Sequence, residues 1–354
     1  MSDAAVRVAP AALAELVTRL YVAAGIPAAD AAACAAQTVD AELHGVASHG
    51  CVRLGVFVDR LARGTVNPTP DVRIVRDLPA YALLDGDRGM SAVGGTRAME
   101  LALAKAAVNG IGAAGVRRLS HTGHVGWFAR MALARGMIGI VASSATPNLA
   151  PSGGAERIIG NNPIAFAIPA AGGEPIVFDM ATSKVARGWV LLAAKAGEAI
   201  PEGWALDAEG RSTTDAQRAV GGTLLPVGDH KGYGLALVLG LLTDALTGAS
   251  DADRPDWLAT DREFLLSMLC IAIDPAQCLG GEFAALVGQV VERVKGSRPA
   301  AGSDGIRIPG EASARRARET AGQGIPLAPA LVAELDRLAV ALGVPRLDRR
   351  AFPS

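Results

Sequence analysis

The chain has 354 residues, and 34 lysines and arginines against 35 aspartates and glutamates leave a net charge of -1. This balance, without a basic stripe, argues against nucleic acid as the main partner. The absence of a bilayer-length apolar run and of a signal peptide predicts a cytoplasmic protein that binds no membrane. The four cysteines show no CxxC or regular spacing, so we expect free thiols in a reducing compartment.

The N-terminal part has a helical pattern. Residues 11–24 and 28–43 are predicted amphipathic helices, because Gly25 ends the first and Pro27 opens the second. A third helix is expected at 52–62, and the Asn-Pro-Thr-Pro segment at 67–70 closes this part. A last helix at 329–344 is expected to pack on these N-terminal helices.

The central part mixes strands and helices, which predicts an α/β (α+β) class. Strands are expected at 72–75, 80–85, 114–119, 137–145, 160–169, 175–181 and 265–274, and helices at 91–108, 127–136, 235–249 and 283–296. Residues 197–222 and 250–262 are predicted loops. Gly110–Gly115 spells Gly-x-Gly-x-x-Gly, but a helix precedes it and a strand follows it. A Rossmann fingerprint needs the reverse order, so we interpret the segment as a helix-to-strand turn.

The strongest candidate site is the stretch AELHGVASHGCVR at 41–53. His49 supplies an imidazole that titrates near neutral pH, and Ser48 beside it can orient the ring. Arg53 can hold a carboxylate with two parallel hydrogen bonds. Together they could protonate a substrate oxygen or nitrogen while binding its acid group. The alternative is a helix end with a glycine and a capping histidine.

Three further motifs could complete a site. His121 lies between a predicted strand and helix, where ligands are often held. His121 and His124 could instead form a zinc pair, but no acidic or cysteine ligand lies nearby in the sequence. Residues 179–183 and 228–234 offer hydroxyls, backbone N–H groups and the His230-Lys231 pair at helix starts, although each could be an ordinary cap. All five histidines fall in these glycine-punctuated motifs, which favours a shared site.

Six motifs in order carry a resemblance to the type-2 malate/L-lactate dehydrogenase family. They are ELHGVASHG (42–50), SHTGHVGWFARMALARGMIGI (120–140), GNNPIAFAIP (160–169), FDMATSKVARG (178–188), GDHKGYGLAL (228–237) and IRIPGE (306–311). The resemblance implies a non-Rossmann dinucleotide-binding domain, here 77–274, with a mixed, largely antiparallel sheet. It also implies a helical domain from both termini, here 1–76 and 275–354, and a homodimer with the site near the interface.

The resemblance further implies an NAD(P)H-dependent enzyme that interconverts a 2-oxo acid and a 2-hydroxy acid without a metal. His49 and Ser48 match the catalytic pair, and His121 matches a second acid/base candidate that also contacts cofactor. Arg53 matches the residue that binds the substrate carboxylate, with Thr182 beside substrate and nicotinamide. The remaining matches to cofactor contacts are Asp179, Met180, Ala181, His230, Lys231, Pro309, Gly310 and Glu311.

Departures from the family pattern keep more than one function open. Trp189 stands where the imine-reducing branch is expected to carry an aspartate, which weakens the runner-up, a reductase of cyclic imine acids such as piperideine- or pyrroline-2-carboxylate. Asn161 replaces a threonine, and His124 stands where small residues are usual. Two further classes stay open, a metal-dependent lyase or hydrolase and a non-catalytic dinucleotide sensor. The choices between NADH and NADPH, and between His49 and His121 as proton donor, also stay open.

Overall fold

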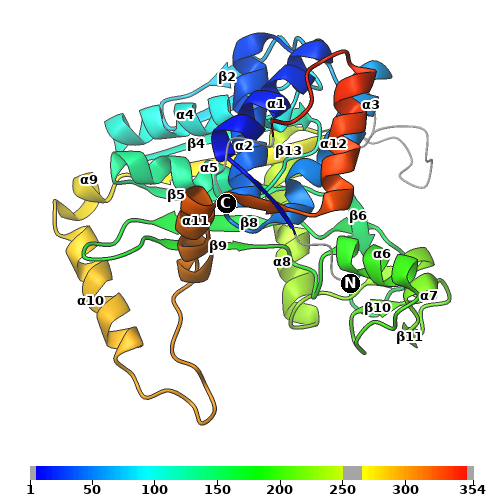
Figure 1. Ribbon diagram of the computed structural model, residues 1–354. Coiled ribbons are helices and arrows are strands. Elements are labelled where there is room, and N and C mark those ends of the chain that lie inside the picture. Colours follow the sequence, from blue (N-terminus) through cyan, green and yellow to red (C-terminus); the bar gives the residue numbers. More distant parts are fainter. Residues whose placement is uncertain (1–4, 250–264, 349–354) are drawn as a thin grey trace.

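The computed structural model describes residues 5–249 and 265–348, and its centre is a seven-stranded sheet (Figure 1). The strand order is β2-β3-β4-β13-β5-β8-β9, and all neighbours are antiparallel except β3 and β4. The strands are β2 Arg73–Asp77, β3 Tyr81–Asp85, β4 Ile111–Leu119, β5 Ile138–Ser143, β8 Ile164–Ile168, β9 Ile176–Met180 and β13 Leu266–Ile273. The predicted mixed, largely antiparallel sheet is confirmed.

Helices cover both faces of this sheet. Helix α4 (Ser91–Asn109) connects β3 to β4 and packs on β4. The two backbones approach so closely that a Cβ at Gly112 of β4 would lie 2.2 Å from the Ala102 carbonyl oxygen of α4. A Cβ at Gly115 would instead lie 2.9 Å from the Thr247 side chain. Side chains three positions apart on a strand point to opposite faces, so Thr247 lies on the face that α4 leaves open. Gly110, where φ is +78°, ends α4 as the predicted helix-to-strand turn, but β4 begins at Ile111, three residues before the predicted start of the strand.

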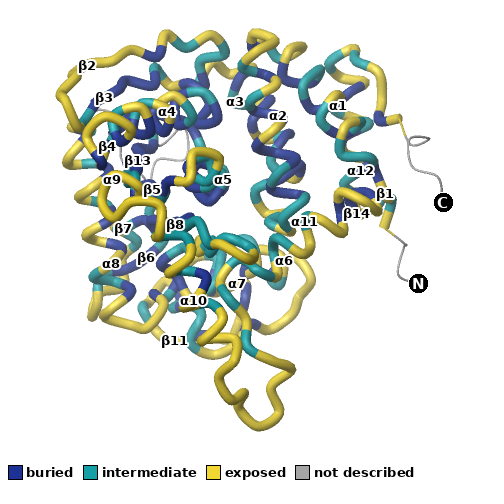
Figure 2. Tube along the Cα trace, turned by 90° about the vertical axis from the view of Figure 1, so that its left-hand side faces the viewer, coloured by how far each residue is buried: buried dark blue, intermediate teal, exposed yellow. Residues whose placement is uncertain are grey.

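A second hydrophobic core joins the two ends of the chain. Its helices are α1 Pro10–Ala23, α2 Ala28–Leu43, α3 Leu54–Ala62 and α12 Pro329–Ala341. Strand β1 (Val6–Val8) pairs antiparallel with β14 (Ile325–Leu327), and Leu16 and Leu335 are buried in the same cluster. These elements lie together on one side of the molecule (Figure 2). The exact division into two domains stays a prediction.

The segment after β13 begins away from that core. It contains α9 (Pro275–Leu279), α10 (Phe283–Lys295) and α11 (Glu311–Gln323). Helix α10 packs on the connection between β8 and β9, where the Ala171 N–H donates to the Ala284 carbonyl at 2.9 Å. Helix α11 returns to α2, because the Ser313 hydroxyl donates to the His44 carbonyl at 3.0 Å.

Several short elements differ from the predictions. The predicted loop at 197–222 contains β10 (Ala205–Leu206), β11 (Ser212–Thr213) and α7 (Ala216–Gly221). With β12 (Thr223–Leu224), β6 (Pro147–Leu149) and β7 (Ile159–Gly160), the two strands form a five-stranded sheet beside α6 (Arg187–Ala196). Strands of two or three residues are too short to show a period-2 pattern, so the sequence does not predict them.

Two predicted helices also have different bounds. The helix at 127–136 is a short α5 (Gly126–Arg130) followed by the 3-10 helix η3 (Met131–Arg135). The apolar helix at 235–249 starts earlier, as α8 (His230–Gly240), and continues as the π-helix η4 (Leu241–Ala245). The predicted loop at 250–262 lies outside the described residues. No described helix is long and apolar enough to cross a membrane.

Candidate active site

The chain after α2 folds into two consecutive 3-10 helices, η1 (Ala47–His49) and η2 (Cys51–Arg53), which present the predicted catalytic residues. The buried Glu42 carboxylate accepts the Cys51 backbone N–H at 2.7 Å. A Cβ at Gly50 would lie 2.2 Å from the same carboxylate, so a larger residue at that position would displace the Glu42 side chain. Glu42, which the sequence did not single out as a site residue, therefore shapes the turn.

Within this turn, Ser48, His49 and Arg53 are joined by hydrogen bonds. Ser48 Oγ and His49 Nδ1 lie 3.0 Å apart. Arg53 Nε donates to the Ser48 carbonyl at 2.8 Å. The structure brings together these three residues, as their spacing in the sequence suggests.

His121, from the segment after β4, lies next to His49. The centres of the two imidazole rings are 5.6 Å apart, and the Phe57 ring lies 5.7 Å from His121. The Gly123 N–H donates to His121 Nδ1 at 3.0 Å, so in the neutral ring the proton is on Nε2. The Ser91 hydroxyl fixes the His121 carbonyl at 2.8 Å.

Burial and nearby positive charge keep both rings neutral. Burial lowers the pKa of His49 to about 4, and the charges of Arg53 and His124 contribute. Burial also lowers the pKa of His121 well below its usual value, with further contributions from His49, Arg53 and Arg60. At neutral pH both imidazoles are therefore uncharged: His49 can accept a proton on Nε2 when its Nδ1–H donates to Ser48, whereas neutral His121 offers an Nε2–H donor.

The predicted cofactor residues gather around the end of β9. The Asp179 carboxylate accepts the Gly126 N–H at 2.8 Å. After Met180 and Ala181, Thr182 is fully buried, and its hydroxyl has no partner among the described residues. The Val227 N–H donates to the Thr182 carbonyl at 2.9 Å. This contact brings the segment that leads into α8 alongside the strand end.

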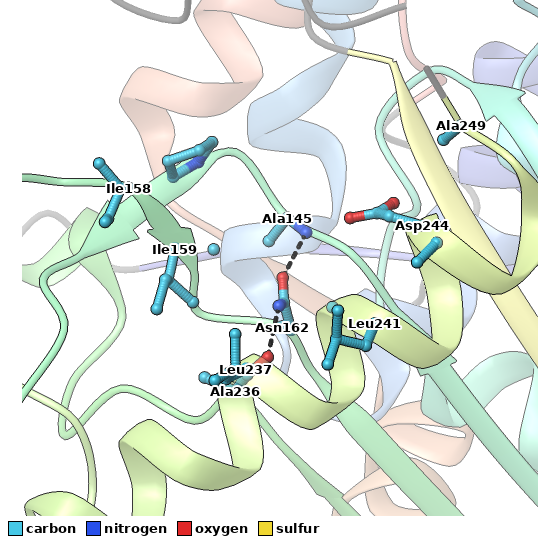
Figure 3. Close-up of a pocket in the computed structure, with 13 residues that line it drawn as sticks. Ala145, Ile158, Ile159, Asn162, Ala236, Leu237, Leu241, Asp244 and Ala249 are labelled. Atoms are coloured by element: carbon cyan, nitrogen blue, oxygen red, sulfur yellow. Dashed lines mark hydrogen bonds between the residues drawn. The ribbon is translucent and has the colours of Figure 1, made fainter. Parts of the chain in front are cut away.

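His230 and Lys231 are exposed in the first turn of α8. Asn162 ties this helix to the rest of the fold: its Oδ1 accepts the Ala145 N–H at 2.9 Å, and its Nδ2 donates to the Ala236 carbonyl at 2.8 Å (Figure 3). A cavity of about 260 Å³ beside α8 has mostly apolar walls and contains none of the predicted site residues.

The segment of Pro309, Gly310 and Glu311 lies against the edge of β9 that does not pair with β8. The Val177 N–H donates to the Pro309 carbonyl at 3.1 Å, and a Cβ at Gly310 would lie 2.7 Å from the Val177 carbonyl oxygen. The Glu311 carboxylate accepts the Ile308 N–H at 3.2 Å and pairs with Lys295. Glu311 thus shapes the turn with its side chain.

A buried charged network lies beside these residues, and sequence reasoning does not find it. Asp40 Oδ2 lies 2.8 Å from His124 Nε2, its Oδ1 lies 3.2 Å from His44 Nδ1, and Arg130 donates to the same carboxylate. The local signal is limited to the four-residue spacing of Asp40 and His44 on one helix, because His124 is 84 residues away. In the described part of the chain, no group of three or more His, Cys, Asp or Glu could hold a metal ion.

Arg60 is a further residue whose charge acts on the site. Arg60 lies seven residues after Arg53. Burial is the main cause that lowers the pKa of Arg53, and the charge of Arg60 adds to it. The same charge also helps to lower the pKa of His121. Trp189 lies in the first turn of α6 with 61% of its surface exposed.

Comparisons with known proteins define the class. The description "Malate/L-lactate dehydrogenase" belongs to the family model that matches residues 8–336. L-sulfolactate dehydrogenase of Methanocaldococcus jannaschii is 41% identical over 295 residues, which are 82% of this chain and 84% of that protein. The structure of malate dehydrogenase from Pyrococcus horikoshii OT3 matches with a TM-score of 0.88 and 35% identity over 97% of both chains.

The structure of Δ1-piperideine-2-carboxylate reductase from Pseudomonas syringae also matches, with a TM-score of 0.86 and 29% identity over 94% of this chain and 99% of that chain. Relatives at 36% and 33% identity are named for NADP(+) and NAD(+), respectively. The fold and these matches define an NAD(P)-dependent dehydrogenase that acts on 2-hydroxy acids. The chain belongs to the malate/L-lactate dehydrogenase family, so the predicted family, enzyme class and cofactor class are confirmed.

Proposed function

We propose that this enzyme reduces a 2-oxo acid to a 2-hydroxy acid, and performs the reverse reaction, with Arg53 binding the substrate carboxylate and His49 transferring the proton. The observation that carries the proposal is the hydrogen-bonded turn of Ser48, His49 and Arg53 beside the His121 ring. Arg53 uses Nε to bind the Ser48 carbonyl, so its two terminal nitrogens can make the paired hydrogen bonds that a carboxylate accepts.

The residues around β9 fit a dinucleotide. A buried hydroxyl without a described partner, on Thr182, is a polar group that a ligand can satisfy. His230 and Lys231 add exposed side chains, and Lys231 a positive charge, at a helix N-terminus, where phosphate groups bind. In this proposal Asp179, Met180, Ala181 and Thr182 line the nicotinamide. His121, His230, Lys231, Pro309, Gly310 and Glu311 make or shape the other contacts. These residues would hold the cofactor, which would supply the hydride chemistry when bound.

The substrate itself prepares His49 for proton transfer. In the free enzyme the Arg53 charge helps to hold the pKa of His49 down to about 4. A substrate carboxylate on Arg53 offsets that charge, so the imidazole can bind the proton that it then donates to the carbonyl oxygen. Ser48 holds Nδ1 and leaves Nε2 for the substrate. A positioned general acid contributes roughly a hundred- to ten-thousandfold in rate, and His121 is the second candidate for this role.

The positive charge near the site favours an acid with two negative groups. The charges of both Arg53 and Arg60 act on His121, and a second guanidinium suits a second carboxylate or a sulfonate. Relatives named for malate and sulfolactate support the same substrate class. We therefore propose oxaloacetate or sulfopyruvate as better substrates than pyruvate.

Loss of reduced-nicotinamide absorbance tests these proposals. NADH and NADPH should be run separately with pyruvate, oxaloacetate, sulfopyruvate, 2,3-diketogulonate and piperideine-2-carboxylate. We expect the highest kcat/KM with an open-chain dianion. Turnover of the cyclic imine alone would replace the proposal with the imine-reductase alternative, for which a reductase of known structure is the supporting relative. No turnover with any acid would refute the proposal.

We further propose a homodimer. Large apolar side chains are exposed along α8 and η4, and an exposed apolar strip of this kind is typical of an interface. They include Leu237, Val238, Leu241, Leu242 and Leu246, which are 40–55% exposed. Sedimentation velocity should give twice the chain mass of 36.0 kDa, and Leu241→Glu should shift the protein toward the monomer. The four described cysteines are all free thiols, which supports the cytoplasmic location proposed here.

A further inference from the structure

His124 lies between two carboxylates next to the proposed catalytic residues. Its Nε2 is 2.8 Å from Asp40 Oδ2, and its Nδ1 is 3.8 Å from Asp179 Oδ2. The side chain is only 4% exposed. An imidazole whose two nitrogens both face carboxylates is most stable with a proton on each nitrogen, because only the imidazolium donates on both sides.

The surroundings agree with a charged ring. Burial alone would lower the pKa of His124, but the nearby Asp179 carboxylate and the hydrogen bond to Asp40 outweigh burial and raise it, even though Arg130 opposes them. The titratable and charged groups that face the network are Asp40 from α2, His44 at the C-cap of α2, Arg130 from α5, Asp179 from β9 and His49 from η1.

Asp40 is the fixed end of this network. It is anchored by Arg130 and by His44 as well as by His124. Asp179 is the other end, and it is held only by the Gly126 N–H and His124 among the contacts of the described residues. The network therefore runs from the helical part of the chain to the strand end that the proposed function places along the nicotinamide.

We propose that His124 is a positioning residue of the active site: anchored by Asp40, it fixes the Asp179 carboxylate at the end of β9 and places a positive charge beside His49. This inference rests on the proposed function for the meaning of that strand end. It does not rest on which 2-oxo acid is the substrate.

A double-mutant cycle tests the path through Asp179. His124→Gln keeps a donor toward Asp40 but removes the charge, and Asp179→Asn removes the carboxylate that His124 holds. If His124 acts through Asp179, each variant lowers kcat about tenfold or more, and the double variant is within about twofold of the worse single variant. If the loss of kcat in the double variant equals the product of the losses in the two single variants, the residues act independently and the proposal is wrong.

His44→Gln is the matched control, because His44 contacts the opposite oxygen of the same Asp40 carboxylate. We expect it to leave kcat within about threefold of the wild type, since it touches neither Asp179 nor His49 in any described contact. A loss equal to that of His124→Gln would mean that the network only stabilises the fold, and the proposal would be wrong.

Histidine NMR on the protein without cofactor gives an independent readout. The chain has five histidines, which can be assigned with single variants. His124 should titrate above the usual range of histidine, and its titration midpoint should fall in Asp179→Asn, a variant that keeps the buried anchor at Asp40. The midpoint of His49 should rise in His124→Gln. An unchanged His124 midpoint in Asp179→Asn would overturn the proposal, whether or not the wild type turns over any acid tested.

Discussion

Replacing Asp40 with asparagine should destabilise the protein far more than replacing a surface aspartate. Asp40 is 14% exposed and is the shared anion for His124, which is 4% exposed, and Arg130, which is 20% exposed. Asparagine keeps the shape but leaves both cations without their counter-charge. Breaking a buried pair by removing one partner costs about 3–5 kcal/mol, so we expect Asp40→Asn to lower the free energy of unfolding by that amount.

Urea denaturation at pH 6 measures this loss. Asp59→Asn is the control, because Asp59 pairs with Arg63 at the surface, where the two side chains are 53% and 71% exposed. The control should cost less than about 1 kcal/mol. If Asp40→Asn costs no more than Asp59→Asn, the network is not the buried ion cluster described here.

The pH dependence of the same difference adds a second check. The hydrogen bonds from His124 and His44 hold the pKa of Asp40 below its usual value of about 3.9, despite burial, so its contribution is present above that pH and is lost as pH falls further. The pKa of His124 is raised above about 6.5, so its contribution is complete below that pH and is lost as pH rises through the raised value. The difference in the free energy of unfolding between wild type and Asp40→Asn should therefore be largest from about pH 4 to 6.5, and it should become smaller below and above this range.

Three further predictions concern the site itself. Arg53→Gln should raise the KM for the oxo acid roughly 10- to 150-fold, the value of a hydrogen bond between charged groups, while the NAD(P)H dissociation constant stays unchanged by fluorescence titration. In the oxidation direction, kcat/KM should rise with pH through the pKa of His49 near 4 and stay flat from pH 6 to 8, and an inflection at 6.5 assigned to His49 would contradict the burial argument. Gly126→Ala would bring a Cβ within 2.8 Å of Asp179 Oδ2 and should lower kcat by roughly ten- to a hundredfold, whereas Gly188→Ala, with nothing within 4 Å, should be neutral in the same steady-state assay.

Local sequence signals are sufficient for the parts of the fold that are long or punctuated. Gly25 and Pro27 do separate two helices, and α4 does end at Gly110 before β4. The turn that carries Ser48, His49 and Arg53 can be found because all three residues lie within six positions. The same reasoning predicts β13, whose eight residues are almost all buried, from its continuous apolar run.

The missing parts depend on contacts between distant residues. Nothing near Val6 or Ile325 indicates that these two short segments pair with each other across the whole chain. Asp40 falls on an otherwise ordinary amphipathic helix, and its partner His124 lies 84 residues away. The role of Glu42 cannot be predicted from the sequence for a related reason, because it depends on the space that Gly50 leaves for the Glu42 carboxylate. Each of these features depends on how distant segments pack together, and the periodicity of the sequence gives no information about such contacts.

The cost of the charged network argues that it serves more than stability. Taking ions out of water is expensive, and well-packed apolar residues in place of a buried ion pair are often as stable or more so. An apolar residue at position 124 would still fill this buried position, but it could not hold the Asp179 carboxylate. Asp179 is itself partly exposed, at 29%, so an ion pair at its position contributes little to folding. The arrangement makes physical sense if orienting that one carboxylate matters to the reaction, and this is why the His124 and Asp179 variants should fail together.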